Sequence, residues 1–247
     1  MVDATTLGTN SAIFRQLSPW RRSAKTSVLD SMRGCKISVK TALAVLSKSM
    51  TVPGFWPVTL TEGPLVLRPL RLRDRRAWRE VRNRNKKWLS QWDATMPPEG
   101  QIVGQRPPNY NMMIRIMKKE AREGRALPFA IEFEGKFVGQ LTVGGIWGGS
   151  SRGAFFGYWI DESVAGRGLM TKSVELVADY CLKTMLLHRI EINVRPENAA
   201  SCAVALKAGF TKESYRPNYL HIDGDWRDHI GFVKFRDTPT AVQEQYQ

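Results

Sequence analysis

A glycine turn between a strand pattern and a helix pattern constrains the fold of this chain most strongly. The segment GAFFGYWID, residues 153–161, is rich in aromatic residues and predicts a strand. A helical pattern follows from about Gly168 to Thr184. The N-terminus of a helix presents unpaired N–H groups and a partial positive charge, so phosphate oxygens bind there. Gly166 and Gly168 would let the backbone approach such an anion closely.

Two common phosphate-binding motifs are absent from the sequence. There is no GxxxxGK[ST] loop, and no GxGxxG segment opens a βαβ unit. A pair of glycines alone is weak evidence, but its place between a strand and a helix favours an anion site. The turn is therefore expected to belong to a different class of pyrophosphate-binding fold.

The remaining patterns predict one mixed α/β domain without internal repeats. Asp74 is a candidate N-cap for a helix through about Asn85. Glu134-Gly135 and Asp223-Gly224 are candidate hairpin turns. The other expected elements are a strand at 65–70, a helix at 111–124, strands at 126–135 and 136–146, a strand at 188–196, a helix at 197–210 and strands at 211–217 and 225–235.

Composition favours a folded cytoplasmic protein. Hydrophobic residues make up 43% of the chain, which is enough for a sizeable core. No apolar run approaches the roughly 18 residues that a membrane-spanning helix needs. Cys35, Cys181 and Cys202 are odd in number and lack CxxC spacing, so neither a disulfide framework nor a thiolate metal site is expected. The three histidines are too scattered for a metal site.

The net charge of +14 is large for 247 residues. Residues 1–49 hold eight Lys and Arg against two Asp, and the remaining residues are still basic. A polyanionic ligand or partner is plausible on this evidence, whether nucleic acid, ribosome or nucleotide cofactor. A solvated surface with excess charge is an equally open interpretation.

The chain divides into three parts on composition. Residues 1–49 form a basic extension, expected to be flexible, residues 50–237 form the domain, and residues 238–247 form a tail. The segment KISVKTALAVLSKS in the extension has the pattern of an amphipathic helix. An organelle transit peptide would have a similar basic, Ser-rich composition. A flexible extension is the simpler interpretation, and an upstream choice of start codon would account for it, because Met50 opens the domain.

The segments GYWIDESVAGRGLMTKSVE and HRIEINVRPENAASCAVALKAGF resemble motifs A and B of the GCN5-related N-acetyltransferases. The segments NRNKKWLSQWD and DGDWRDHIGF are similar to the RimJ/RimL group, which acetylates the N-terminal amine of ribosomal proteins. The resemblance covers residues 58–237. It implies the acyl-CoA N-acyltransferase fold, a mixed, mostly antiparallel sheet flanked by helices. It also implies acetyl-CoA as co-substrate and no metal.

The resemblance assigns a set of residues to acetyl-CoA. Backbone groups near Trp159 and Ile160 would pair with the pantetheine arm, as a strand edge pairs with an added strand. Asn198 is also assigned to the residues that bind the cofactor. One departure is Ser163, where the family often has Gln or Arg. The CoA pyrophosphate would be held by the backbone amides of Gly166, Arg167, Gly168, Leu169 and Met170.

Acetyl transfer to an amine needs a neutral nucleophile and an acid for the departing thiolate. An N-terminal α-amine has a pKa near 7.7 to 8.0, so a strong base is not obligatory. The carboxylate that the family often uses falls on Asn193, and the one of RimL-like enzymes aligns with Leu220. Glu191, on the same strand face as Asn193, is the first candidate base. The alternative is a surface Glu191 that is paired with Lys or Arg.

The tyrosine that many relatives use as the acid is Ala205 in this chain. The RimL-like alternative is Ser201, within the first turn of the expected helix. An ordinary hydroxyl at the start of a helix is the competing interpretation. Cys202 is expected to be a buried and inert thiol.

Aromatic and acidic residues are candidates for the acceptor side. Trp88 and Trp92 are expected in a polar loop, in the region that shapes the acceptor cleft in relatives, whereas Trp78 is expected in the core. Tyr219 and His221 are candidates to line the acceptor channel, with His221 relaying a proton. Asp223 lies in an acidic segment that would attract a cationic amine.

Three functions remain open from the sequence. The first is acetylation of a protein N-terminus, most plausibly Ala or Ser of a ribosomal protein, by direct attack without an acyl-enzyme. The second is acetylation of a small amine such as an antibiotic. The third is ribosome or RNA binding on a CoA-binding fold with little catalysis. The expected partners are therefore an amine substrate and, through the basic surface, the ribosome, with no membrane and with a monomeric or dimeric state.

Overall fold

The structure is a computed structural model that describes residues 55–100 and 109–236. The basic extension over residues 1–49, its predicted amphipathic helix and the tail over residues 238–247 lie outside the described residues. Cys35 and Met50 lie outside them as well. The fold below is that of the described part of the chain.

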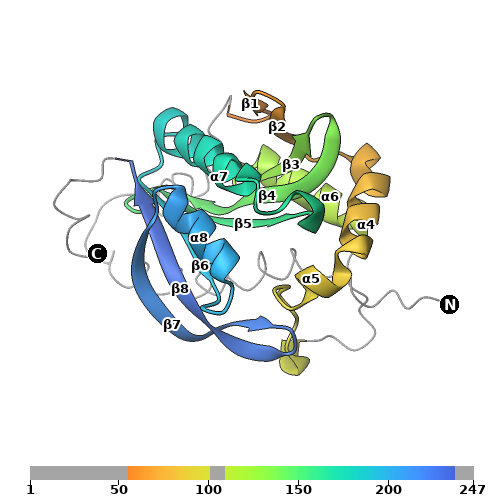
Figure 1. Ribbon diagram of the computed structural model, residues 1–247. Coiled ribbons are helices and arrows are strands. Elements are labelled where there is room, and N and C mark those ends of the chain that lie inside the picture. The colour runs from red at the N-terminus through yellow and green to blue at the C-terminus, as the bar shows by residue number, and fades with distance from the viewer. Residues whose placement is uncertain (1–54, 101–108, 237–247) are drawn as a thin grey trace, which may run out of the picture.

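One eight-stranded sheet forms the centre of the described part, with the strand order β1-β2-β3-β4-β5-β6-β8-β7 (Figure 1). All neighbouring strands are antiparallel except β5 and β6, which are parallel. This arrangement confirms the predicted mixed, mostly antiparallel sheet. The strands are β1 (Leu60–Glu62), β2 (Leu65–Pro69), β3 (Leu127–Phe133), β4 (Lys136–Trp147), β5 (Gly153–Ile160), β6 (Arg189–Val194), β7 (Thr211–Ile222) and β8 (Asp225–Phe235).

Helices cover both faces of this sheet (Figure 1). One hydrophobic cluster joins the sheet to α4 (Arg75–Arg84), α5 (Lys86–Ser90) and α6 (Tyr110–Arg122). A second cluster joins the opposite face to α7 (Leu169–Asp179) and α8 (Ala199–Lys207). Successive strand residues point to opposite faces, so Trp159 belongs to the first cluster while Ile160 belongs to the second.

Trp78 lies in the core, as its sequence context predicted. Its side chain is buried, and its indole N–H donates to Oε1 of Gln140 at 3.0 Å. The Gln140 amide in turn donates to the hydroxyl of Thr142 at 3.0 Å. The buried amide is therefore satisfied on both sides, which a buried polar group requires.

The predicted turns and helix ends are confirmed by their backbone angles. Glu134 and Gly135 have φ angles of 51° and 75°, and Asp223 and Gly224 have 50° and 83°. A two-residue hairpin of this type needs positive φ at both positions. Gly209 has a φ of 79° just after α8, which is typical of a glycine that ends a helix.

Four details differ from the sequence prediction. β1 is an additional strand, and residues 86–90 form α5 rather than a loop. The helix after the glycine turn ends at Asp179 and continues as a π-helical turn over Tyr180–Thr184. β7 extends to Ile222 and is thus longer than predicted.

Asp74 occupies the N-cap position of α4, but its side chain makes no capping bond to that helix. The carboxylate accepts instead from Nη1 of Arg68 at 2.8 Å and from the N–H of Arg71 at 2.8 Å. Arg68 is itself buried and also donates to Glu132 at 2.6 Å. A buried guanidinium needs anionic partners, which explains why Asp74 turns toward the sheet.

Within the described ranges, no helix combines the length and the apolar character needed to cross a lipid bilayer.

Candidate active site

The strands β5 and β6 diverge along their length and open a gap in the sheet. Their pairing runs from Gly153 with Arg189 to Phe156 with Ile192 and stops there. Beyond this point β5 remains paired with β4 through Ile160, and β6 remains paired with β8. The two facing strand edges therefore have backbone groups that no neighbouring strand satisfies, which suits an extended ligand.

A cavity of about 960 Å³ occupies this gap and the space around it. Residues from α7 and α8 line it on one side of the sheet. Residues from α5, the segment after α5, β7 and β8 line it on the other. The cavity is thus reached by side chains from both faces, as a site for two substrates requires.

The glycine turn lies at one end of the cavity. Gly166 and Gly168 line it and have φ angles of 76° and 77°. A Cβ added at either position would meet no atom within 4 Å, so the backbone conformation, and not crowding within the protein, requires glycine here. Gly168 is the N-cap of α7, so the unpaired N–H groups of the first helical turn begin at Leu169.

A buried carboxylate fixes the start of this turn. Asp161 follows β5 directly and is 2% exposed. It accepts from Nδ2 of Asn85 at 2.9 Å and from the N–H of Ser163 at 3.2 Å, and it is ion-paired with Arg84. Asn85 also accepts from the N–H of Glu162 at 3.1 Å. The C-terminal end of α4 therefore holds the turn in place.

The charge of Asp161 is maintained by these contacts. Burial alone would raise its pKa, but the hydrogen bonds from Arg84, Asn85 and Ser163 lower the pKa to about 2. The carboxylate is thus ionised over the whole range in which the protein would act. Ser163, where the family often has Gln or Arg, uses its backbone rather than its side chain in this network.

Two hydroxyl groups meet at the side of the cavity that faces α8. Asn198 accepts from the N–H of Ser201 at 3.0 Å and so caps the helix. The Ser201 hydroxyl lies 2.9 Å from the hydroxyl of Tyr158 on β5. Burial raises the pKa of Tyr158 above its ordinary value, against the opposing effect of the Ser201 bond, so the phenol keeps its proton. Both residues line the cavity.

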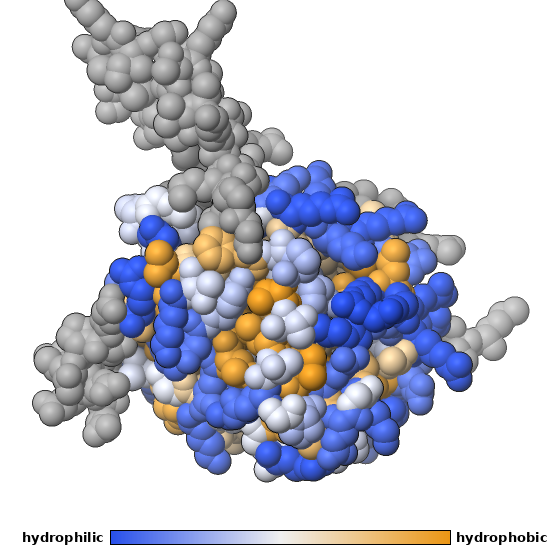
Figure 2. All heavy atoms as spheres, turned by 90° about the horizontal axis from the view of Figure 1, so that it is seen from above, coloured by the Kyte–Doolittle hydropathy of each residue, from blue (hydrophilic) through white to orange (hydrophobic). Residues whose placement is uncertain are grey.

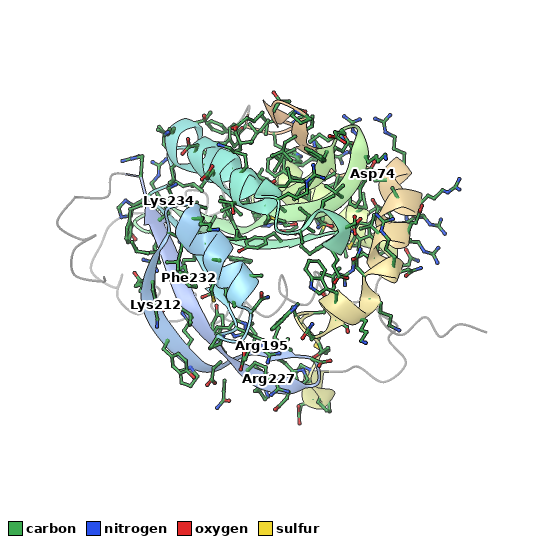
Figure 3. All side chains as sticks on the ribbon, in the orientation of Figure 1. Asp74, Arg195, Lys212, Arg227, Phe232 and Lys234 are labelled. Atoms are coloured by element: carbon green, nitrogen blue, oxygen red, sulfur yellow. The ribbon has the colours of Figure 1, made fainter. Side chains whose placement is uncertain are left out.

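An aromatic wall forms the opposite side of the cavity. Trp88, Trp92 and Tyr219 all line it. Arg195 holds this wall, because its Nη1 donates to the carbonyl of Gln91 at 3.0 Å and its guanidinium lies 5.2 Å from the ring centre of Trp92. Figure 3 shows Arg195 near the lower end of α8, and Arg195 is itself one of the residues that line the cavity.

Most of the residues predicted for the site line this one cavity. They are Trp88, Trp92, Trp159, Ile160, Gly166, Gly168, Leu169, Met170, Asn198, Ser201 and Tyr219. The residues that do not line it are Arg167, Glu191, His221 and Asp223.

Glu191, the candidate base, has both carboxylate oxygens engaged elsewhere. One accepts from Nε of Arg189 and the other from Nη2 of Arg216, each at 2.9 Å. Arg189 is also ion-paired with Glu213. The structure therefore places Glu191 in an ion-pair network between β6 and β7, the alternative that the sequence had left open.

The other three residues serve local contacts. Arg167 turns its guanidinium over the ring of Phe133 at 4.8 Å. Nδ1 of the buried His221 is 2.7 Å from the hydroxyl of Thr95, which fixes the segment after α5 against β7. Asp223 is exposed at the tip of the β7–β8 hairpin. None of these contacts brings the side chain to the cavity.

Tyr158 and Arg195 were not assigned a role from the sequence. Alternation along β5 separates Tyr158 from the core residue Trp159, which is the signal that could have found Tyr158. Arg195 acts on a loop that precedes it by about a hundred positions in the chain, so local patterns carry no sign of it. Among the described residues, no group of three or more His, Cys, Asp and Glu is placed to hold a metal ion.

A parallel strand pair that splays beside a glycine turn and a helix N-terminus defines the class of acyl-CoA N-acyltransferases. Comparison with known proteins agrees with this class. Residues 64–211 match the acetyltransferase (GNAT) domain. The solved structure of Mycobacterium smegmatis RimJ in complex with CoA-disulfide has a TM-score of 0.67 and 37% identity, covering 73% of this chain and 88% of that one.

Two curated relatives extend the comparison. The chain is 30% identical over 177 residues to the [Ribosomal protein uS5]-alanine N-acetyltransferase of Escherichia coli K12, covering 70% of this chain and 88% of that protein. It is 40% identical over 94 residues to the probable N-acetyltransferase YjcK of Bacillus subtilis 168, covering 38% of this chain and 52% of that protein. The chain belongs to the GNAT family and is an acetyl-CoA-dependent N-acetyltransferase.

Proposed function

We propose that this enzyme acetylates the N-terminal α-amine of a protein, with Ala or Ser of a ribosomal protein as the acceptor. The observation that carries this proposal is the cavity that reaches both faces of the sheet and ends in an aromatic wall. An open, aromatic cleft suits a peptide terminus, because Trp and Tyr give large contact areas at low entropy cost. The activity in the name of the E. coli relative supports the same acceptor class.

The glycine turn and the splayed strands would hold acetyl-CoA. Backbone N–H groups from Gly166 to Met170, together with the dipole of α7, suit its pyrophosphate. The unpaired strand edges at Trp159 and Ile160 suit the pantetheine arm. Bound in this way, acetyl-CoA supplies the acetyl group as a thioester.

The hydroxyl pair would assist the departure of the thiolate. Ser201 donates a hydrogen bond to the sulfur as negative charge develops there, and Tyr158 donates to the Ser201 oxygen. Two hydrogen bonds in series, from Tyr158 to Ser201 and from Ser201 to the sulfur, strengthen the hydrogen bond that the sulfur accepts. Cys202 does not line the cavity, so the nucleophile nearest to these hydroxyls in sequence is not available for an acyl-enzyme. This arrangement supports direct attack by the amine, without an acyl-enzyme.

The test of this proposal is CoA release with a panel of acceptors. Peptides that begin with Ala, Ser, Met and Asp are compared with free lysine and with aminoglycosides. We expect kcat/KM for the Ala and Ser peptides to exceed that for the small amines by at least about tenfold, because only a peptide fills the aromatic wall. Preferential acetylation of an aminoglycoside would favour the small-amine function. Binding of acetyl-CoA without turnover of any acceptor would favour the RNA-binding function.

The outer surface of α4 and of the turn before it is strongly basic, and α4 leads directly into α5, which carries Trp88 of the aromatic wall. Arg73, Arg75, Arg76 and Arg79 are exposed, and Glu80 is the acidic residue among them. Figure 2 shows strongly hydrophilic side chains gathered on the side of the molecule where α4 lies. A surface of this kind attracts a polyanion such as ribosomal RNA, and it would bring the ribosome to the acceptor side.

Reversing this charge should therefore affect large and small substrates differently. For the triple variant Arg75→Glu, Arg76→Glu and Arg79→Glu, we expect kcat/KM with ribosomal particles to fall by about 10- to 100-fold at low salt. Activity on a short peptide should stay within about twofold. The matched control reverses Arg115, Lys119 and Arg122 on α6, which are also exposed and, like the α4 arginines, lie outside the cavity lining. Equal losses from both triple variants would contradict a docking role for α4.

A further inference from the structure

His229 lies on the opposite face of the sheet from the hydroxyl pair. On β8, Phe232 and Ile230 pack against the cluster beneath α7 and α8. Because strand residues alternate, His229 points to the other face, where it lines the cavity. Tyr158 belongs to the α7–α8 side. His229 and the Tyr158–Ser201 pair therefore approach the cavity from opposite sides.

A single hydrogen bond of the His229 ring defines its tautomer. Its Nδ1 is 3.0 Å from the carbonyl oxygen of Arg227. A carbonyl oxygen only accepts, so Nδ1 carries the hydrogen and Nε2 of the neutral ring carries a lone pair. Among the described residues, none forms a hydrogen bond with Nε2. The ring thus presents a free acceptor.

The surroundings of His229 keep the imidazole neutral. The side chain is 3% exposed, and this burial is the main cause that lowers its pKa below 6.5, with a further contribution from the charge of Arg195. The carbonyl of Arg227 and the charges of Glu197 and Asp228 act in the opposite direction but are outweighed. Tyr219 contacts the ring edge to face, with centres 5.5 Å apart.

A second polar group without a partner lies on the same face. Asn193 on β6 alternates with the core residues Ile192 and Val194, so it points away from α7 and α8. It lines the cavity, and its Oδ1 is buried without a hydrogen-bond partner among the described residues. Its Oδ1 lies toward Gly231 of β8, 3.5 Å from the position that a Cβ on this glycine would occupy. An amide cannot take a proton, so Asn193 leaves His229 as the candidate base on this face.

We infer that His229 is the general base of this enzyme, accepting at Nε2 a proton from the acceptor ammonium. This inference rests on the proposed function, because it assigns the amine to the face of Trp88, Tyr219 and His229. The amine nitrogen then forms the N–C bond as the C–S bond breaks. Of the two protons that the ammonium loses in becoming an amide, one passes through Nε2 to solvent and the other ends on the sulfur.

The variant His229→Asn tests this role with little change in shape. The amide nitrogen of Asn can retain the bond to the Arg227 carbonyl, while the group at Nε2 is lost. We expect kcat/KM at pH 6.5 to fall by about 100-fold. At pH 9 the loss should shrink to less than about tenfold, because the amine is then neutral in solution. When kcat/KM of His229→Asn is plotted against pH, its acidic limb should lie at the amine pKa of about 7.7 to 8.0, above that of the unmodified enzyme.

The control is His221→Asn. His221 is also buried but, unlike His229, does not line the cavity. Its acidic limb should coincide with that of the unmodified enzyme. CoA binding and thermal unfolding of both variants report on folding. A His229→Asn profile that is lowered equally at every pH would show a structural role and overturn the inference.

The unmodified enzyme provides a test that needs no variant. With a peptide whose amine has a pKa near 7.7 to 8.0, the acidic limb should lie below pH 6.5, where His229 becomes protonated. A limb at the pKa of the amine would overturn the inference even while peptide acetylation continued. Absence of peptide acetylation would instead refute the proposed function, so the two failures are distinguishable.

Discussion

The double variant Gly166→Val, Gly168→Val is expected to raise the Kd for CoA by at least about 100-fold, which corresponds to about 2.7 kcal/mol. Both glycines have positive φ, a conformation that costs an L-residue roughly 1–2 kcal/mol and a β-branched residue more. The turn would therefore leave its present conformation. The N–H groups that precede α7 would then no longer converge on the pyrophosphate.

The matched control for this variant is Gly135→Val. Gly135 has a φ of 75° and open space around its Cβ position, as Gly166 does, but it lies in the β3–β4 hairpin away from the cavity. It should reduce the melting temperature without changing the Kd for CoA, as measured by titration calorimetry. Unchanged CoA binding by the double glycine variant would rule out the turn as the pyrophosphate site.

The parts of this fold that could be predicted from sequence are those set by local geometry. Alternating residues identified the strands, and Gly135, Gly209 and Gly224 marked backbone positions with positive φ. The order of the strand, the glycine turn and the helix favoured an anion site for the same reason. In each case the residue types directly restrict the backbone.

The parts that could not be predicted depend on residues far apart in sequence. Glu191 lies on the same strand face as Asn193, as expected, but the pairing of β6, β8 and β7 brings Arg216 to its carboxylate. The position of His229 depends on the same register, which shifts between Arg216 and Leu220 on β7. Periodicity along one strand carries no information about such partners. This explains why the sequence favoured Glu191 and His221 over His229.

A similar argument applies to the acceptor side. Residues 86–90 are polar enough to suggest a loop, yet they form α5 because Leu89 is buried against the cluster of α4 and α6. Tertiary packing here outweighs local preference. The placement of Trp88 on a helix, rather than on a loop, gives the aromatic wall a fixed position.

The hydroxyl pair gives the second large effect. For Ser201→Ala we expect kcat to fall by about 100-fold with the KM for acetyl-CoA nearly unchanged, because the hydrogen bond to sulfur forms only as the thiolate departs. For Tyr158→Phe, which removes the second donor alone, a fall of about tenfold is expected. Steady-state CoA release with an Ala peptide measures both. Cys202→Ala, at the adjacent position but outside the cavity lining, is the control and should retain full activity.

The double variant decides whether the two hydroxyls act as one unit. In the proposed mechanism Tyr158 acts on the sulfur through Ser201, and the two hydroxyl oxygens are 2.9 Å apart. Once Ser201 is Ala, the loss of the Tyr158 hydroxyl should cost little more, so the double variant should be about as slow as Ser201→Ala. A fully additive loss of about 1,000-fold would mean that Tyr158 contacts the substrate independently. Comparison of the two single variants with the double variant thus distinguishes a relay through Ser201 from two separate donors. Only in a relay does the second substitution leave kcat nearly unchanged.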